Sequence, residues 1–265
     1  MIPALSDLPE LRTLSLDENA LGRIEANDFL LLANSSLEML DLNNCDIRYI
    51  SPEAFLPLTR LRHLILSSNI VTNDNLVHVF HTMAGHHSGL KAVSLSGFNF
   101  AGSPPRELLS VLSKMDVDEL DLSKNTLPTL NNVTFPLMAN ILELDLNSCG
   151  IISIENGSFD HFPSLRRLNL AFNRLGQIPA AVASLDQLQW LSLSENSGRG
   201  ELELVDHQLS AMIHLIYLDL SNNNIGKLSR AAFVGLSRLE HLLINNGNQY
   251  TKQYIYILNT IYLYT

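Results

Sequence analysis

The chain has 265 residues, of which 46% are hydrophobic and 17% are charged. This composition is too apolar for a disordered chain, and no apolar run is long enough to span a bilayer. The formal net charge of -10 produces a field that repels phosphate backbones and anionic membrane surfaces. We therefore expect a packed, soluble protein that does not bind nucleic acid and that meets a membrane only through a segment absent from this chain.

One pattern, Leu-x-x-Leu-x-Leu-x-x-Asn-x-Leu, recurs along most of the chain. It begins most clearly at Leu11, Leu61, Leu165 and Leu215. Variants begin at Leu37, Leu90, Val117, Ile141, Leu188 and Leu239. The starts of these ten units lie 23 to 29 residues apart, which is typical of leucine-rich repeats. The pattern predicts an α/β solenoid with a curved parallel sheet on its concave face and with loops and short helices on its convex face.

Each unit holds one strand and one turn. The Leu-x-Leu segment predicts a short strand whose leucines point inward and whose x residues point outward. The Asn that follows turns the chain and satisfies backbone groups that would otherwise be buried without partners. Cys45 and Cys149 stand at this Asn position. Four repeats separate them by roughly 19 Å, beyond the reach of a disulfide, so we expect two buried structural thiols.

A second apolar residue and a Phe follow the strand in several units, as Ile50 with Phe55, Ile154 with Phe159, and Leu228 with Phe233. With the 24-residue spacing, this Phe resembles the typical class of leucine-rich repeat in extracellular animal proteins such as the Toll receptors, slit and chaoptin. The resemblance covers roughly residues 1–247. It implies an extracellular or cell-surface location for the full-length protein, and it indicates fold more strongly than activity.

Three stretches depart from the repeat pattern. Residues 72–88 and residues 104–115 carry apolar residues at helical spacing behind capping residues, and they predict convex helices. After Asn196, the run Ser197-Gly198-Arg199-Gly200 predicts a longer loop before the unit that begins at Leu215.

Neither end of the array shows the polar cap that an open solenoid needs, and no secretory signal begins the chain. We interpret residues 1–247 as an internal segment of a longer array without caps. Residues 248–265 form an atypical Tyr- and Ile-rich tail. This tail is interpreted as a gene-model artefact, with a glycolipid-anchor signal as the alternative.

Motifs of known catalytic chemistry are absent from the sequence: there is no nucleophile elbow, HExxH, phosphate-binding glycine loop or EF-hand spacing. We expect no enzymatic activity and no cofactor. His78, His81, His86 and His87 lie close together, but no third ligand and no supporting shell can be identified. We therefore expect solvated histidines on the convex side and no metal site.

Three sequons begin at Asn34, Asn132 and Asn156 and make these residues candidates for N-glycosylation. A chain this rich in Asn, Ser and Thr produces about this number by chance, so the count does not indicate secretion. All three lie outside the predicted strands, where a glycan would leave the concave face open.

Two patches emerge when the outward residues of successive strands are aligned. Repeats seven to nine place Arg167, Phe172, Trp190 and Tyr217 on adjacent strands, and these residue types are enriched in binding hot spots. We take them as the first candidate for partner contact. In the alternative interpretation, Phe172 pads the turn and the other two rings form a cross-strand pair. Repeats five and six supply an acidic patch that either steers a basic partner or is only a solvated surface: Asp118, Glu119, Asp121, Glu143 and Asp145.

The leading hypothesis is a non-enzymatic adhesion or receptor module that binds a protein ligand, or another leucine-rich-repeat chain, through the concave face. A cytoplasmic signalling scaffold is the second hypothesis. A truncated, nonfunctional product is the third.

Overall fold

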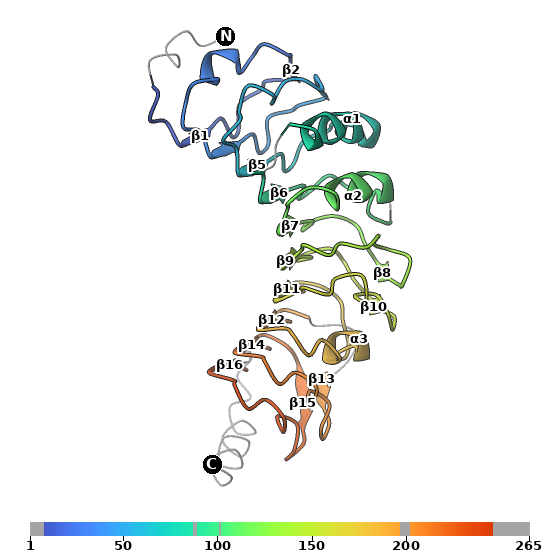
Figure 1. The fold of residues 1–265 in the computed structure, drawn as a ribbon. Coiled ribbons are helices and arrows are strands. Elements are labelled where there is room, and N and C mark those ends of the chain that lie inside the picture. Colours follow the sequence, from blue (N-terminus) through green and yellow to red (C-terminus); the bar gives the residue numbers. More distant parts are fainter. Residues whose placement is uncertain (1–7, 87–88, 101, 197–201, 246–265) are drawn as a thin grey trace.

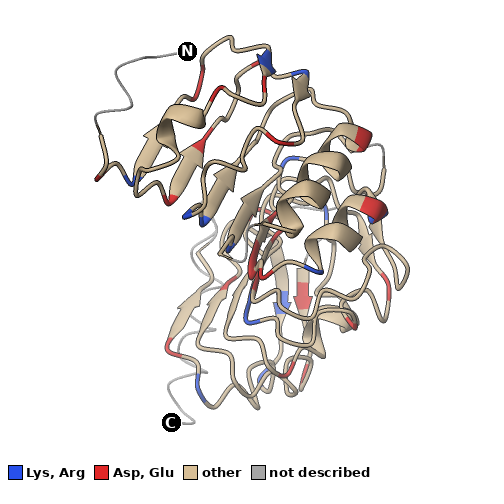
Figure 2. Cartoon of the chain, turned by 45° about the horizontal axis from the view of Figure 1, so that its top comes forward, with Lys and Arg blue, Asp and Glu red and all other residues tan. Residues whose placement is uncertain are grey.

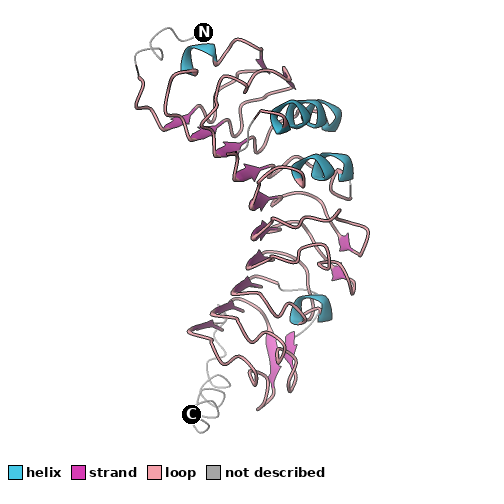
Figure 3. Ribbon diagram, viewed as in Figure 1, coloured by secondary structure: helices cyan, strands magenta, loops and turns pink. Residues whose placement is uncertain are grey.

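A computed structural model describes residues 8–86, 89–100, 102–196 and 202–245 of the chain. The molecule is an arc, with one row of strands along the inner edge and helices, loops and short strand pairs along the outer edge (Figure 1). Loops make up most of the ribbon (Figure 3). Strand β1 lies at one end of the arc and β16 at the other, so residues distant in sequence meet only through neighbouring repeats.

The inner row is one parallel sheet of ten strands, which confirms the predicted solenoid. In spatial order the strands are β1 (Thr13–Ser15), β3 (Met39–Asp41), β5 (His63–Ile65), β6 (Ala92–Ser94), β7 (Glu119–Asp121), β9 (Glu143–Asp145), β11 (Arg167–Asn169), β12 (Trp190–Ser192), β14 (Tyr217–Asp219) and β16 (His241–Leu243). The central residue of each strand, a valine in β6 and a leucine in the other nine, points into the solenoid, because side chains alternate between the two faces of a strand. Leu40, Leu64 and Leu168 have no exposed surface, for example.

The pairing register is the one that the sequence alignment predicts. Arg167 stands opposite Trp190, and Trp190 stands opposite Tyr217. Two residues further along each strand, Asn169 pairs with Ser192 and Asp145. The outward residues therefore form two straight columns across the concave face.

Helices on the convex face replace the extended backbone of other repeats. The two predicted helices are confirmed as α1 (Asn73–Ala84) and α2 (Arg106–Leu112). The Thr72 side chain caps α1 by accepting a hydrogen bond from the Asn75 N–H at 3.3 Å. The apolar face of α1 is fully buried and consists of Leu76, Val79, Phe80 and Met83.

Two further helical segments have no counterpart in the sequence analysis: the one-turn α3 (Ala180–Ala183) and the 3-10 helix η2 (Leu30–Leu32). Both are too short to show apolar residues at helical spacing, which is the pattern that marks α1 in the sequence.

Three two-stranded parallel sheets also lie outside the main sheet. They are β2 (Arg23–Ile24) with β4 (Tyr49–Ile50), β8 (Thr129–Leu130) with β10 (Ser153–Ile154), and β13 (Leu202–Leu204) with β15 (Ile225–Leu228). The last pair corrects the expectation of a plain loop between Asn196 and Leu215, because residues 202–204 form a strand. The run 197–200 lies outside the described residues.

A ladder of asparagine side chains joins consecutive repeats. Asn173 donates from Nδ2 to the carbonyl oxygens of Leu146 and Leu170, both at 2.9 Å, and to that of Ala171 at 3.2 Å. Its Oδ1 accepts from the backbone N–H groups of Cys149 and Ile151, both at 3.0 Å. One buried amide thus satisfies five backbone groups across two repeats, which explains a polar residue inside an apolar column.

The two cysteines take part in this ladder, which confirms them as buried free thiols. Cys149 donates from Sγ to the Leu122 carbonyl oxygen at 3.2 Å, and Cys45 to that of Leu16 at 3.0 Å. A thiol sulfur is a weaker acceptor than Oδ1, and the Leu127 N–H instead reaches the Cys149 carbonyl oxygen at 2.9 Å. Burial raises the pKa of Cys149 to about 12, so this thiol stays protonated and unreactive at neutral pH.

Candidate protein-binding face

A continuous row of side chains crosses five strands of the concave face. The Arg167 Nε lies 3.2 Å from Glu143 Oε1, and its guanidinium lies 4.9 Å from the centre of the Trp190 ring. On the other side, Trp190 stacks on Tyr217 with 5.2 Å between ring centres and 10° between ring planes. Tyr217 in turn lies 6.0 Å from the His241 ring. The parallel register produces this row, since it places one residue from each strand in a line.

Both faces of the Trp190 indole are therefore covered from within the chain, and a partner would meet ring edges rather than a ring face. Trp190 and Tyr217 are half-buried in this arrangement. Their conformations are fixed before binding, which lowers the entropy that an interface must lose. The cross-strand pairing that the sequence left as an alternative is present, and it does not remove the rings from the surface.

Phe172 does not join this row, which corrects its placement on a strand. Strand β11 ends at Asn169, and Phe172 lies in the turn that follows, with a φ of 54° and 56% of its surface exposed. At the matching turn position the neighbouring repeats carry small or polar residues with positive φ, such as Ser148 and Glu195. A bulky residue in this conformation is uncommon.

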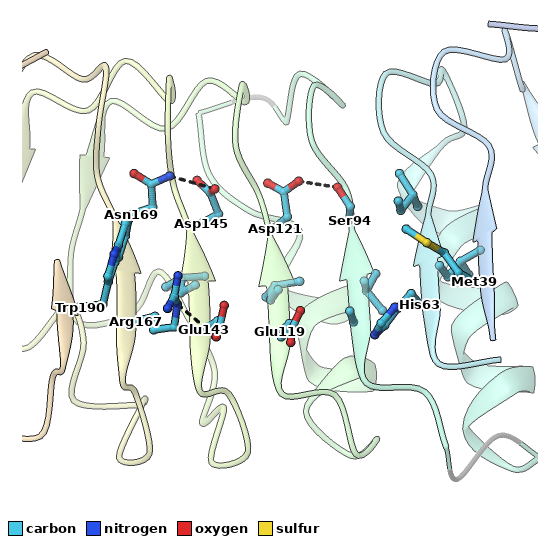
Figure 4. Close-up of a pocket in the computed structure, with 16 residues that line it drawn as sticks. Met39, His63, Ser94, Glu119, Asp121, Glu143, Asp145, Arg167, Asn169 and Trp190 are labelled. Atoms are coloured by element: carbon cyan, nitrogen blue, oxygen red, sulfur yellow. Dashed lines mark hydrogen bonds and ion pairs between the residues drawn. The ribbon is translucent and has the colours of Figure 1, made fainter. Parts of the chain in front are cut away.

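The acidic patch divides into two rows. Glu119 and Glu143 share the column of Arg167, while Asp121 and Asp145 stand one step further along their strands. The Asp145 carboxylate accepts from the Asn147 N–H at 2.7 Å and from Asn169 Nδ2 at 3.0 Å (Figure 4).

Asp121 makes the equivalent contacts. It accepts from the Ser123 N–H at 2.8 Å and from the Ser94 hydroxyl (Figure 4). The two aspartates thus close the turns after their strands as well as adding charge.

Burial acts on two of these carboxyl groups. It raises the pKa of Glu143, with further upward contributions from Glu119 and Asp118, while Arg167 opposes the shift. Burial also raises the pKa of Asp145, against the hydrogen bonds from Asn147 and Asn169. Repulsion between neighbouring carboxylates therefore adds to the effect of burial in raising the pKa values of Glu143 and Asp145.

Asp118 stands in neither row, although its charge contributes to the raised pKa of Glu143. It precedes β7, and its Oδ2 pairs with Lys91 Nζ at 3.7 Å. Since that charge has a cation beside it, Asp118 contributes less to the field over the sheet.

The concave face is hollowed between these rows into an open groove of about 420 Å³. The groove crosses β3 to β12, and its lining includes residues that the sequence analysis did not select: Met39, His63, Ile65, Ala92, Ser94 and Asn169. Figure 4 shows His63 and Met39 at one end and Trp190 at the other. Figure 2 shows acidic segments spread along the strands and helices of the whole arc.

The remaining candidate residues lie away from this groove. His78, His81 and His86 are exposed on or just after α1, and His87 lies outside the described residues. Within the described ranges, no group of three or more His, Cys, Asp or Glu side chains could hold a metal ion. None of the helices in those ranges is long and apolar enough to cross a membrane. Asn34, Asn132 and Asn156 are all exposed and all lie outside the strands, as predicted.

Comparison with known families decides the classification. The family model described as leucine-rich repeat matches residues 9–71, 139–197 and 202–249, more than half of the chain. The chain belongs to the leucine-rich-repeat family. The predicted resemblance to the repeats of Toll receptors is confirmed by similarity to such proteins.

Three relatives illustrate this similarity. Toll-like receptor 3 of Boselaphus tragocamelus is 30% identical over 232 residues, 84% of this chain and 22% of the relative. Human Toll-like receptor 3 is 24% identical over 249 residues, 88% of this chain and 26% of the relative. The transforming growth factor beta activator LRRC33 of Danio rerio is 27% identical over 191 residues, which are 71% of this chain and 26% of the relative. The leucine-rich-repeat chain thus spans about a quarter of the length of these relatives.

Proposed function

We propose that this leucine-rich-repeat array is a non-enzymatic module that binds a protein ligand through its concave face, in an adhesion or receptor protein at the cell surface or outside the cell. The observation that carries the proposal is the pre-formed row of Arg167 and Trp190, which line one end of the groove, and Tyr217, which stacks on Trp190. Half-buried rings beside a cation are the surface chemistry of binding hot spots. The names of the relatives, which describe a receptor and an activator, support the same class of function.

Trp190→Ala and Tyr217→Ala test this surface. Each removes one ring of the row and should weaken ligand binding by about tenfold or more, because hot-spot truncations cost at least about 1.4 kcal/mol. The expected loss of stability is below about 1 kcal/mol, since the two rings form a cross-strand pair on an open face. Binding to a panel of purified secreted and cell-surface ectodomains measures the effect.

Leu137→Ala is the matched control, because Leu137 is a large apolar residue that is 60% exposed outside the sheet. It should leave binding to the same ectodomain unchanged. Equal affinities for the wild-type chain, Trp190→Ala and Tyr217→Ala would assign the ligand to another surface.

Glycan occupancy tests the location. When the chain is secreted from animal cells behind an added signal sequence, we expect glycans at Asn132 and Asn156, which are exposed in turns outside the sheet. Digestion with a glycan-specific amidase should then lower the apparent mass of the wild-type chain, and less so that of Asn132→Gln. A chain that leaves the cells without any glycan would favour the cytoplasmic scaffold instead.

A further inference from the structure

Strand β6 forms the lowest part of the concave face. Its outward residues, Ala92 and Ser94, are the smallest such pair in the ten-stranded sheet. Longer side chains flank both positions, with His63 and Ile65 on β5 and Glu119 and Asp121 on β7. Since neighbouring strands lie about 4.8 Å apart, the two flanking strands stand roughly 10 Å from each other. The result is a slot along β6, and all six residues line the groove.

The two walls of this slot differ in chemistry. On the β5 side, Ile65 offers aliphatic surface beside the His63 ring. On the β7 side stand two carboxylates. Figure 4 places His63 and Glu119 on opposite sides of the strand that carries Ser94. A side chain that is apolar along its stem and cationic at its tip would satisfy both walls at once.

The two carboxylates of the β7 wall differ in how far their hydrogen-bonding capacity is already used within the chain. Asp121 is held in place by the Ser94 hydroxyl and the Ser123 N–H. Glu119 is exposed, and within the described ranges its side chain has no hydrogen bond or ion pair. In the same column, Glu143 already pairs with Arg167. Glu119 is therefore the carboxylate of this column without a cationic partner in the described chain.

We propose that the β6 slot receives an arginine or lysine side chain from the protein ligand of the concave face. The aliphatic stem of that side chain lies over Ala92 against Ile65, and its cationic head pairs with Glu119 and Asp121. An arginine fits best, because its planar head can bind a carboxylate through two parallel hydrogen bonds. This inference rests on the proposed function and adds the chemistry of the partner.

Charge selects this occupant over the alternatives. The formal net charge of -10 and the carboxylates at the slot repel phosphate groups and acidic peptides. A neutral apolar side chain would remove water from Glu119 and Asp121 without replacing their hydrogen bonds. Beyond the β7 wall of the slot, the groove continues over three more strands as far as Trp190, which is longer than one side chain. An extended basic segment of a protein fits this path, with alternate side chains directed at the sheet.

The test uses a fluorescein-labelled peptide of six Arg-Ser repeats as the probe, with fluorescence polarisation as the readout at low salt. Ala92→Phe fills the slot, and Glu119→Gln removes the unpaired charge; each should weaken binding of the probe by about tenfold. A peptide with citrulline in place of arginine should bind the wild-type chain at least about tenfold more weakly.

Two matched variants control for these changes. Thr13→Phe places the same ring in the same column on β1, outside the groove. Glu240→Gln removes an exposed charge that precedes β16. Both variants should bind the probe with an affinity within about twofold of that of the wild-type chain, because they leave the slot untouched.

The proposal is wrong if the arginine peptide does not bind the wild-type chain, if it binds Ala92→Phe and wild type equally, or if the citrulline peptide binds as well. These outcomes concern the slot alone. An ectodomain whose binding is lost in Trp190→Ala but retained in Ala92→Phe and Glu119→Gln would overturn the slot and leave the concave-face function standing.

Discussion

Asn173→Ala is expected to lower the free energy of unfolding by about 3 to 5 kcal/mol, because it leaves several buried backbone groups without partners. The Asn173 amide serves three carbonyl oxygens and two N–H groups from two consecutive repeats. It also lies mid-array, where the coupling between neighbouring repeats transmits stability. Denaturation by urea, followed by circular dichroism, measures the change.

Asn19→Ala is the matched control. Asn19 stands at the same position in the first unit, but it is exposed, and among the described residues its Nδ2 binds only carbonyl oxygens of its own repeat, at 2.9 Å and 3.2 Å. Its replacement should cost less than about 1 kcal/mol. Asn173→Cys should fall between the two, since a thiol keeps a donor, as Cys149 does, and is a weaker acceptor than the amide oxygen. Equal losses for Asn173→Ala and Asn19→Ala would mean that the ladder does not couple the repeats.

Phe135→Ala is expected to destabilise the chain by about 3 to 5 kcal/mol through the cavity that it leaves. Phe135 has no exposed surface and meets the edge of Phe162, with 5.0 Å between ring centres. It occupies the same repeat position as the buried Phe55 and Phe159. Each repeat packs only against its two neighbours in the solenoid, so few other groups can fill the space that Phe135 leaves.

Phe233→Ala provides the comparison, because Phe233 holds the same repeat position but is only partly buried. Its loss should be clearly smaller than that of Phe135→Ala in the same urea titration. A larger effect at Phe233 than at Phe135 would contradict the greater burial of Phe135.

The repeat pattern predicts most of this fold because it encodes both the strand and its register. Each of the ten units has an inward leucine position, and an Asn or Cys follows it in most units. These positions fix which residues face outward, so the columns of Trp190 and Asp145 follow from the sequence. Unit four departs from this rule. Its ladder position holds Phe98, which stacks on Phe100 with 5.7 Å between ring centres, next to the repeat that carries α1.

The candidate site was only partly accessible to the same reasoning. Large aromatic side chains mark Trp190 and Tyr217 in the sequence, whereas Ala92 and Ser94 carry no such signal, because it is their small size that creates the slot. Phe172 was misplaced because its turn begins three residues earlier, after Asn169. The direction in which Arg167 extends, toward Glu143 and Trp190 together, depends on side-chain geometry that a sequence column does not contain.

The central claim is that the concave face binds a protein, and hydroxyl-radical footprinting tests it most directly. Trp190 and Tyr217 are reactive, half-buried rings on that face, whereas the half-buried Tyr49 lies on the opposite side in β4, with Arg23 at 4.5 Å from its ring centre. Addition of a saturating ectodomain from the binding panel should reduce oxidation of Trp190 and Tyr217 and leave that of Tyr49 unchanged. Protection of Tyr49 with no change at the two concave rings would contradict the account.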